Sequence, residues 1–107
     1  MKNYPKCYVD TTLTVIGGKW KPIILWHLNQ VSPLRFSELE KRIDGITQKM
    51  LTQQLREMEK DNLISRKVYA VVPPRVEYSV TEHGQSLNKV LFELGRWGEK
   101  HRNQQSA

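Results

Sequence analysis

The sequence predicts a small, mainly α-helical domain with one β-hairpin, and three patterns lead to this prediction. Apolar residues recur at helical spacing in five segments of the chain. A tight turn at Asp44-Gly45 joins the third and fourth of these segments, and two stretches of alternating apolar and polar residues follow the fourth. Two helices joined by a short turn and followed by a hairpin are typical of a winged helix-turn-helix domain. The predicted order is helix, helix, short strand, helix, helix, strand, strand, helix.

The first two predicted helices precede the helix-turn-helix. Val9, Leu13 and Ile16 have helical spacing, and Gly17-Gly18 ends this helix. The next helix begins near Lys19 and is apolar on all sides, which predicts that it forms the buried centre of the domain.

The predicted helix-turn-helix starts after a short strand at Leu34-Arg35. Its first helix opens at Ser37 and ends at Asp44-Gly45. Thr47 is a suitable N-cap for the second helix, which extends from Gln48 to about Lys60. The apolar residues of that second helix share one face: Leu51, Leu55 and Met58.

Two strands and a last helix complete the prediction. Residues 64–70 and 76–80 alternate in polarity, and Pro73-Pro74 lies in the loop between them. Thr81 caps a helix that continues to about His101. The apolar stripe of this helix consists of Leu87, Val90, Leu91, Leu94 and Trp97.

The composition fits one folded domain over residues 1–107. Hydrophobic residues make up 38% of the chain and charged residues 26%, which is ordinary for a globular protein. No apolar run approaches the roughly 20 residues that cross a bilayer, and the first residues do not resemble a signal peptide. The single cysteine excludes an internal disulfide. We therefore expect a cytoplasmic protein with no membrane partner.

Positive charge is concentrated in the first two thirds of the sequence. The net charge is +6, from 17 basic and 11 acidic residues, whereas residues 76–107 carry four of each. This distribution favours binding to a polyanion such as double-stranded DNA, although many basic proteins bind no nucleic acid.

The polar face of the helix from Gln48 to Lys60 carries most of the candidate DNA-binding residues. Glutamine can pair with adenine, arginine with guanine, and a threonine methyl group can contact that of thymine, whereas lysine suits phosphate. A solvated helix face is the alternative, and the preceding turn and the following hairpin favour DNA binding over it. The candidate DNA contacts are Arg35, Thr47, Gln48, Lys49, Thr52, Gln53, Arg56 and Arg75.

Two further features each have two interpretations. Arg75, expected at the tip of the hairpin loop, either enters a minor groove or is an exposed turn arginine. Leu94 and Trp97 either meet a second subunit or fold back on Trp20 or Trp26. Because operators are commonly paired half-sites, we expect an isologous homodimer. The candidate interface residues are Val9, Leu13, Leu87, Val90, Leu91, Leu94 and Trp97.

Cys7 is a candidate site of redox sensing. It follows Lys6 and precedes the first predicted helix, and both a neighbouring cation and a helix N-terminus make a thiol more reactive. An inert, partly buried cysteine is the alternative.

Patterns typical of enzymes are absent from the sequence. The histidines at 27, 83 and 101 do not combine with one another or with Cys7 at metal-ligand spacing. Gly17-Gly18-Lys19 lacks the remainder of a phosphate-binding loop. We therefore expect no catalytic residues, no metal and no cofactor.

Several separate motifs resemble one family, in the same order. The sequence resembles the HxlR family of winged helix regulators, which is similar to the multiple-antibiotic-resistance regulators, in GGKWKPIILWHL (17–28), RFSELEKRIDGITQKMLTQQLREMEKDNLISR (35–66), PPRVEYSVTEHGQSL (73–87) and RWG (96–98). The resemblance implies a dimer joined by its terminal helices, with the helix from Gln48 to Lys60 in the major groove and the loop around Arg75 beside it. Because several members sense oxidants or electrophiles through a cysteine near the N-terminus, it also implies this role for Cys7. Reversible oxidation of Cys7 would need a bridge to the other subunit or to a small thiol, and alkylation by an electrophile is the other route.

The expected function is transcription regulation by sequence-specific DNA binding, usually repression, by a homodimer on a pseudo-palindromic operator. Two alternatives come from other classes. One is a protein-interaction module whose polar helix face meets an acidic partner, and the other is a sensor whose main event occurs at Cys7 or in a cavity between helices.

Overall fold

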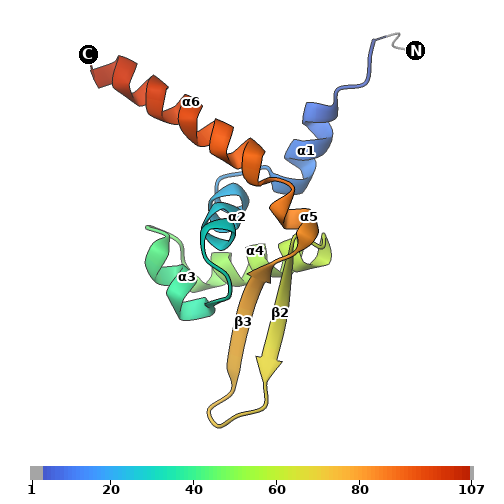
Figure 1. Ribbon diagram of the computed structural model, residues 1–107, viewed down its shortest axis with the longest axis vertical. Helices are drawn as coiled ribbons and strands as arrows, with labels where there is room; N and C mark the ends of the chain where they lie inside the picture. Colours follow the sequence, from blue (N-terminus) through green and yellow to red (C-terminus); the bar gives the residue numbers. More distant parts are fainter. Residues whose placement is uncertain (1–3, 107) are drawn as a thin grey trace.

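A computed structural model describes residues 4–106 and confirms the predicted winged helix-turn-helix architecture (Figure 1). In chain order the elements are α1 (Tyr8–Ile16), α2 (Trp20–Gln30), β1 (Leu34–Arg35), α3 (Phe36–Arg42), α4 (Gln48–Lys60), β2 (Ile64–Tyr69), β3 (Arg75–Val80), α5 (Glu82–Gln85) and α6 (Asn88–Ser106).

The core forms around α2, which lies at the centre of the body in Figure 1 and contacts α3, α4, α5 and α6. Ile24 and Leu25 of α2 are fully buried, as predicted for this helix, whereas Trp26 on its outer side is 42% exposed. The predicted inner face of α4 is buried as well, since Leu51 and Met58 are 0% exposed and Leu55 is 2% exposed. This burial fixes which side of α4 faces outward.

The turn between α3 and α4 depends on a glycine and a threonine. Gly45 has a φ of 83°, in the left-handed region that glycine adopts without a steric penalty. The side chains of Ile43 and Ile46, on either side of it, are buried in the core. Thr47 caps α4 as predicted, because its Oγ1 accepts a hydrogen bond from the amide of Met50 at 3.1 Å. The direction in which α4 leaves the turn is therefore well defined.

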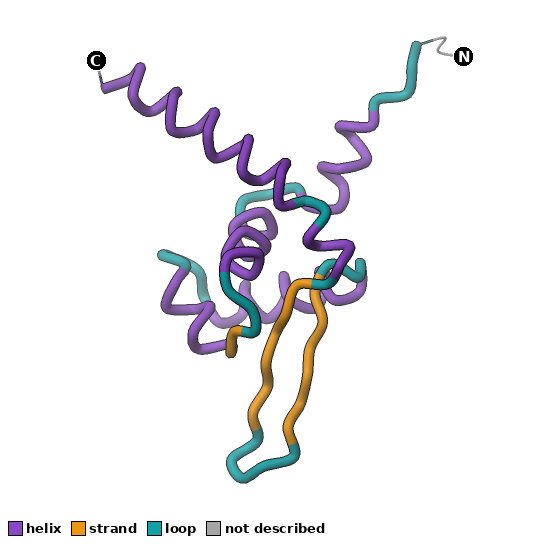
Figure 2. The backbone as a smooth tube through the Cα atoms, viewed as in Figure 1, coloured by secondary structure: helices purple, strands orange, loops and turns teal. Residues whose placement is uncertain are grey.

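The three strands form one antiparallel sheet in the order β1-β3-β2. The hairpin pairs Ile64 with Val80 at one end and Tyr69 with Arg75 at the other. The two-residue strand β1 pairs Leu34 with Tyr78, which confirms the short strand predicted there. We call β2, β3 and the loop at residues 70–74 the wing, and it extends away from the helical body (Figure 2).

Thr81 joins the end of α4 to the beginning of α5. Its hydroxyl lies 2.7 Å from the carbonyl oxygen of Asn62 and 2.9 Å from that of Leu63, and it accepts a hydrogen bond from the amide of Gly84 at 3.0 Å. Gly84 is buried, and a Cβ atom there would overlap the Leu63 carbonyl and lie 2.7 Å from a methyl carbon of Val80. The packing at this junction thus requires glycine.

The last predicted helix, Thr81 to about His101, is in fact two helices. Residues 86 and 87 separate α5 from α6, and α6 continues to Ser106. At the break, the hydroxyl and the amide of Ser86 both hydrogen-bond to the carbonyl of His83, three residues earlier, and the amide is shared with the carbonyl of Glu82. Such local bonds compete with the regular α-helical pattern. None of the helices over residues 4–106 is both long and apolar enough to span a membrane.

Candidate nucleic-acid interface

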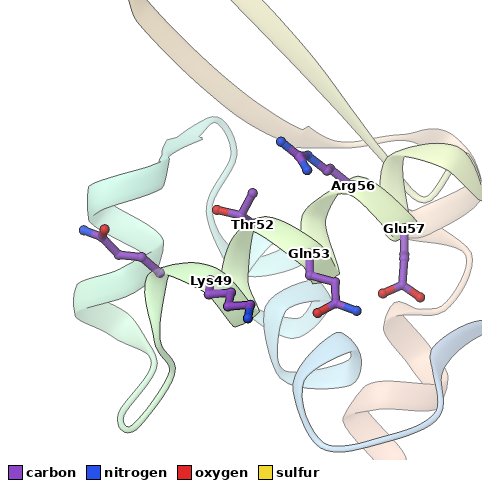
Figure 3. Close-up of a pocket in the computed structure, with 6 residues that line it drawn as sticks. Lys49, Thr52, Gln53, Arg56 and Glu57 are labelled. Atoms are coloured by element: carbon purple, nitrogen blue, oxygen red, sulfur yellow. The ribbon is translucent and has the colours of Figure 1, made fainter.

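The outer face of α4 is a polar surface opposite the buried side of the helix (Figure 3). Thr52 and Arg56 project to the side on which the wing lies. Lys49, Gln53 and Glu57 project to the opposite side. An open hollow is lined by these five residues and one more, and we call this set the α4 outer face: Gln48, Lys49, Thr52, Gln53, Arg56 and Glu57. The structure thus brings together five of the eight predicted DNA contacts.

The one carboxylate on this face is neutralised by a lysine from another helix. Nζ of Lys21, at the start of α2, lies 3.3 Å from a carboxylate oxygen of Glu57, and the Lys21 side chain is only 12% exposed. Within residues 4–106 no ion pair involves Lys49 or Arg56. The α4 outer face therefore presents a net positive charge, which suits a phosphate backbone. Sequence reasoning missed the role of Lys21, because its partner is 36 residues away.

Two of the predicted contacts lie at the edges of this surface. Thr47 is exposed, and its hydroxyl oxygen caps α4. Arg35 is exposed at the N-terminus of α3, where its amide donates a hydrogen bond to Glu38 at 3.0 Å. Arg35 lines a separate hollow between α3 and the wing loop, together with Arg75 and residues 71–74. A cation from the helix-turn-helix and one from the wing thus line the same hollow.

The expectation that Arg75 lies at the tip of the wing is wrong. Arg75 is the first residue of β3 and pairs with Tyr69, so it lies at the base of the loop. Its guanidinium is 4.3 Å from the centre of the Tyr69 ring, and its Nε is 3.7 Å from a carboxylate oxygen of Glu77. These contacts keep the side chain against the strands. The tip itself is apolar, and Val72 there is fully exposed.

The predicted dimer residues divide into two groups. Leu91 is only 4% exposed and belongs to the core of the subunit, so the prediction that it lies at an interface is corrected, whereas Leu87 is partly buried against the same core. Leu91 lines a hollow together with residues of α2, because α6 packs against that helix. The remaining five are exposed large apolar residues: Val9, Leu13, Val90, Leu94 and Trp97.

The exposed apolar residues of α1 and α6 line two neighbouring hollows. Leu13 and Leu94 line a hollow between α1 and α6. Leu94 also lines a second hollow, between α2 and α6, which includes Trp26. Trp97 does not fold back on Trp20 or Trp26, because it is 68% exposed and stacks on His101 with ring centres 5.0 Å apart. We call Val9, Leu13, Val90, Leu94 and Trp97 the apolar face.

One family model matches most of the sequence. It describes the HxlR-like helix-turn-helix, and it matches residues 15–106. The chain belongs to the HxlR-like helix-turn-helix family. This confirms the resemblance stated from the sequence motifs.

Similar proteins of this family are transcriptional regulators. The uncharacterized HTH-type transcriptional regulator YdeP of Bacillus subtilis is 50% identical over 101 residues, which are 94% of this chain and 78% of YdeP. The redox regulator HypR in its reduced form matches with a TM-score of 0.86 at 45% identity, over 94% of this chain and 98% of HypR. The oxidized form of HypR matches with a TM-score of 0.82 at 48% identity, over 88% of this chain and 96% of HypR. This HxlR-like protein is therefore a DNA-binding transcriptional regulator and not an enzyme.

Cys7 of this HxlR-like regulator is exposed and immediately precedes α1. It occupies the N-cap position, and its side chain makes no capping hydrogen bond. The ammonium of Lys6 lies 5.5 Å from the centre of the Tyr8 ring, so the neighbouring cation is held beside the same helix end. The side chain of Cys7 is therefore not buried within its own subunit. Within residues 4–106, no three metal-binding side chains form a group that could hold a metal ion.

Proposed function

We propose that this HxlR-like regulator is a homodimeric repressor that binds a pseudo-palindromic operator and is switched by modification of Cys7. The α4 outer face carries the proposal. It combines amide, hydroxyl and cationic side chains on one exposed side of a helix whose other side is buried. Such a helix can enter a major groove while the wing contacts the adjacent backbone.

The residues of this face have different proposed roles. Gln48, Thr52 and Gln53 read base edges, because amides and a threonine methyl group distinguish bases in the major groove. Lys49 and Arg56 bind phosphate, or guanine in the case of Arg56. The residues at the edges of the surface make flanking contacts: Arg35, Thr47 and Arg75.

The apolar face is the proposed dimer interface. It combines residues of α1 and α6, and both helices lie at the end of the molecule opposite the wing (Figure 1). A two-fold axis through this end leaves both copies of α4 free to face DNA. We expect half-site centres about 34–36 Å apart, one turn of the duplex. A dimer of this span excludes polymerase from a promoter that it overlaps, which favours repression.

Cys7 is the proposed sensor of an oxidant or a small electrophile. Its exposure next to α1 supports this proposal, as does the similarity of the chain to HypR, a redox regulator. Because the chain has a single cysteine, a disulfide must form with the partner subunit or with a small thiol. The oxidant then takes up two electrons, and both thiols lose their protons. An electrophile would instead alkylate the thiolate.

Fluorescence anisotropy tests this proposal. The protein is titrated onto a labelled duplex from its own upstream region and onto a scrambled duplex, first reduced and then after mild oxidation. We expect tight binding to the upstream duplex only, altered by oxidation in the wild type but not in Cys7→Ser. Specific binding that oxidation does not change would reject the proposed switch at Cys7 and would still support the DNA-binding regulator. Equal binding to both duplexes would favour a protein-interaction module instead.

A further inference from the structure

A crevice between α4 and the wing lies next to the α4 outer face. It encloses about 240 Å³, and Leu55 and Tyr78 form part of its lining. Thr52 and Arg56 line both the crevice and the α4 outer face, so the two surfaces are continuous. Figure 3 shows both side chains projecting from α4 toward the wing. The complete lining is Thr52, Leu55, Arg56, Glu59, Arg66 and Tyr78.

Two arginines and one carboxylate give the crevice its charge. Nε of Arg66, on β2, lies 3.5 Å from a carboxylate oxygen of Glu59, on α4. The Arg66 side chain is 48% exposed and that of Glu59 is 38% exposed, so solvent or a ligand can reach the pair. Arg56 has no ion-pair partner in the part of the chain that the structure describes. The crevice thus has one more cation than anion.

The charges of Arg56 and Arg66 both act on the phenol of Tyr78. Burial of the phenol raises its pKa, the charge of Arg66 lowers it, the charge of Glu59 raises it, and the charge of Arg56 lowers it. Arg66 also lies directly across the strand pair from Tyr78. Arg56, Arg66 and the Tyr78 phenol therefore line the same crevice, and Thr52 adds a second hydroxyl group to the lining.

We propose that this crevice binds one phosphate of the DNA backbone, with Arg56 and Arg66 as the cationic donors and Glu59 as an internal competitor for Arg66. The proposal rests on the proposed function, because it requires α4 to lie in a major groove. Guanidinium groups bind phosphate oxygens through paired hydrogen bonds. The backbone runs along the edge of the groove, which is where the side of α4 next to the wing would lie.

Glu59 has a defined effect in this arrangement. In the free protein its carboxylate holds Arg66, and a phosphate must replace that carboxylate to form its own hydrogen bonds. An exposed ion pair of this kind contributes little to stability, so the exchange is possible. Glu59 therefore weakens binding to every duplex by a similar factor and limits the affinity for random DNA.

The test compares four proteins on a labelled random duplex over a range of KCl concentrations: the wild type, Glu59→Gln, Arg66→Ala and the double variant. We expect Arg66→Ala to reduce the slope of log affinity against log salt by about 1, as for the loss of one phosphate contact. We expect Glu59→Gln to raise affinity by about two- to fivefold. In the Arg66→Ala background the same change should raise affinity less, because the competition no longer exists.

Glu93→Gln is the matched control. Glu93 pairs with Arg96 on α6 at 3.4 Å and both side chains are similarly exposed, but neither residue lines the crevice or the α4 outer face. Glu93→Gln removes one negative charge, as Glu59→Gln does, and should leave DNA affinity unchanged. An equal gain from Glu59→Gln with and without Arg66 would overturn the proposal, because it would reflect net charge alone. Urea unfolding of each variant verifies that it is folded.

Two further measurements show whether the phosphate belongs to DNA or is a free anion, and whether a negative result contradicts this inference alone or the proposed function as well. Calorimetric titration with inorganic phosphate should show no saturable binding to the wild type, and saturable binding lost in Arg66→Ala would assign the crevice to a free oxyanion and overturn the DNA assignment. If the wild type binds its upstream duplex specifically but the variants behave like it, only this inference fails. If the wild type binds no duplex, the proposed function fails as well.

Discussion

The guanidinium of Arg75 lies 4.3 Å from the centre of the Tyr69 ring, directly across the hairpin from it. Nζ of Lys67 lies 4.9 Å from the centre of the same ring. One aromatic side chain therefore contacts two cations at the base of the wing loop. This arrangement sets the positive charge of the wing close to β2 and β3 and away from the apolar tip.

Replacing Tyr69 should destabilise the wing and the protein. Tyr69→Leu removes two cation–π contacts, and each contributes about 0.5–1 kcal/mol at an exposed site. Urea unfolding should show a loss of roughly 1–2 kcal/mol. A double-mutant cycle with Arg75→Ala isolates the contact between Tyr69 and Arg75. A coupling energy of zero would show that the ring does not hold this cation.

Gln53 and Lys49 should differ in how they affect specific and random DNA. Gln53→Ala should cost about 1–3 kcal/mol on the operator and little on random duplex, because only a base contact carries sequence information. Lys49→Ala should weaken binding to both duplexes and reduce the salt dependence, as expected for a phosphate contact. Anisotropy titrations on the two duplexes measure both effects. Equal losses from Gln53→Ala on the two would remove its assignment to base reading.

Leu94→Glu should convert the proposed dimer to a monomer. Leu94 is 55% exposed and lines both apolar hollows, so a carboxylate there would be buried without a partner if a second subunit covered it. Val68→Glu is the matched control, because Val68 is 57% exposed on the wing. Light scattering coupled to size exclusion should give a monomer mass for the first variant and a dimer mass for the second. A wild type that is already monomeric would contradict the proposed interface.

His27 should make the protein less stable in mild acid. Burial lowers the pKa of His27 below its usual 6.5, and the nearby charge of Arg42 lowers it further. As the pH falls through 6.5, the unfolded chain takes up a proton that the folded chain does not yet bind, so the free energy of unfolding decreases. We expect His27→Gln to flatten this dependence between pH 7.5 and 5.5.

Urea unfolding at a fixed protein concentration measures the effect, since the proposed dimerisation would make stability depend on concentration. His83→Gln is the control, because His83 is exposed on α5. If His83→Gln flattened the profile as much as His27→Gln does, the burial of His27 would not be the cause.

The helices, the strands and the polar face of α4 were predictable because they depend on local patterns. Buried and exposed residues alternate along α4 with helical spacing, and the cap at Thr47 acts on a residue three positions away. Such signals need no knowledge of the rest of the chain. The candidate residues of α4 therefore occupy one surface, as expected.

Features that depend on tertiary packing were not predictable. Leu91 and Leu94 belong to one apolar stripe, yet Leu91 is buried and Leu94 is exposed, because the crossing of α6 over α2 decides between them. The Arg66–Glu59 pair joins a strand to a helix, and nothing in the local sequence marks it. The position of Arg75 at the base of the loop depends on the register of the hairpin.

The hydrogen bonds of Thr81 link the end of α4 to the start of α5. A rotation of α6 relative to α2 would therefore also rotate α4, unless the backbone at residues 86–87 changes conformation instead. Duplex DNA presents successive major grooves on one side only once per helical repeat, about 34–36 Å along its axis. A small change in the angle between α6 and α5 would rotate each α4 out of phase with its groove. In the proposed dimer, the helical phase of the operator would therefore depend on the junction between α5 and α6 within each subunit.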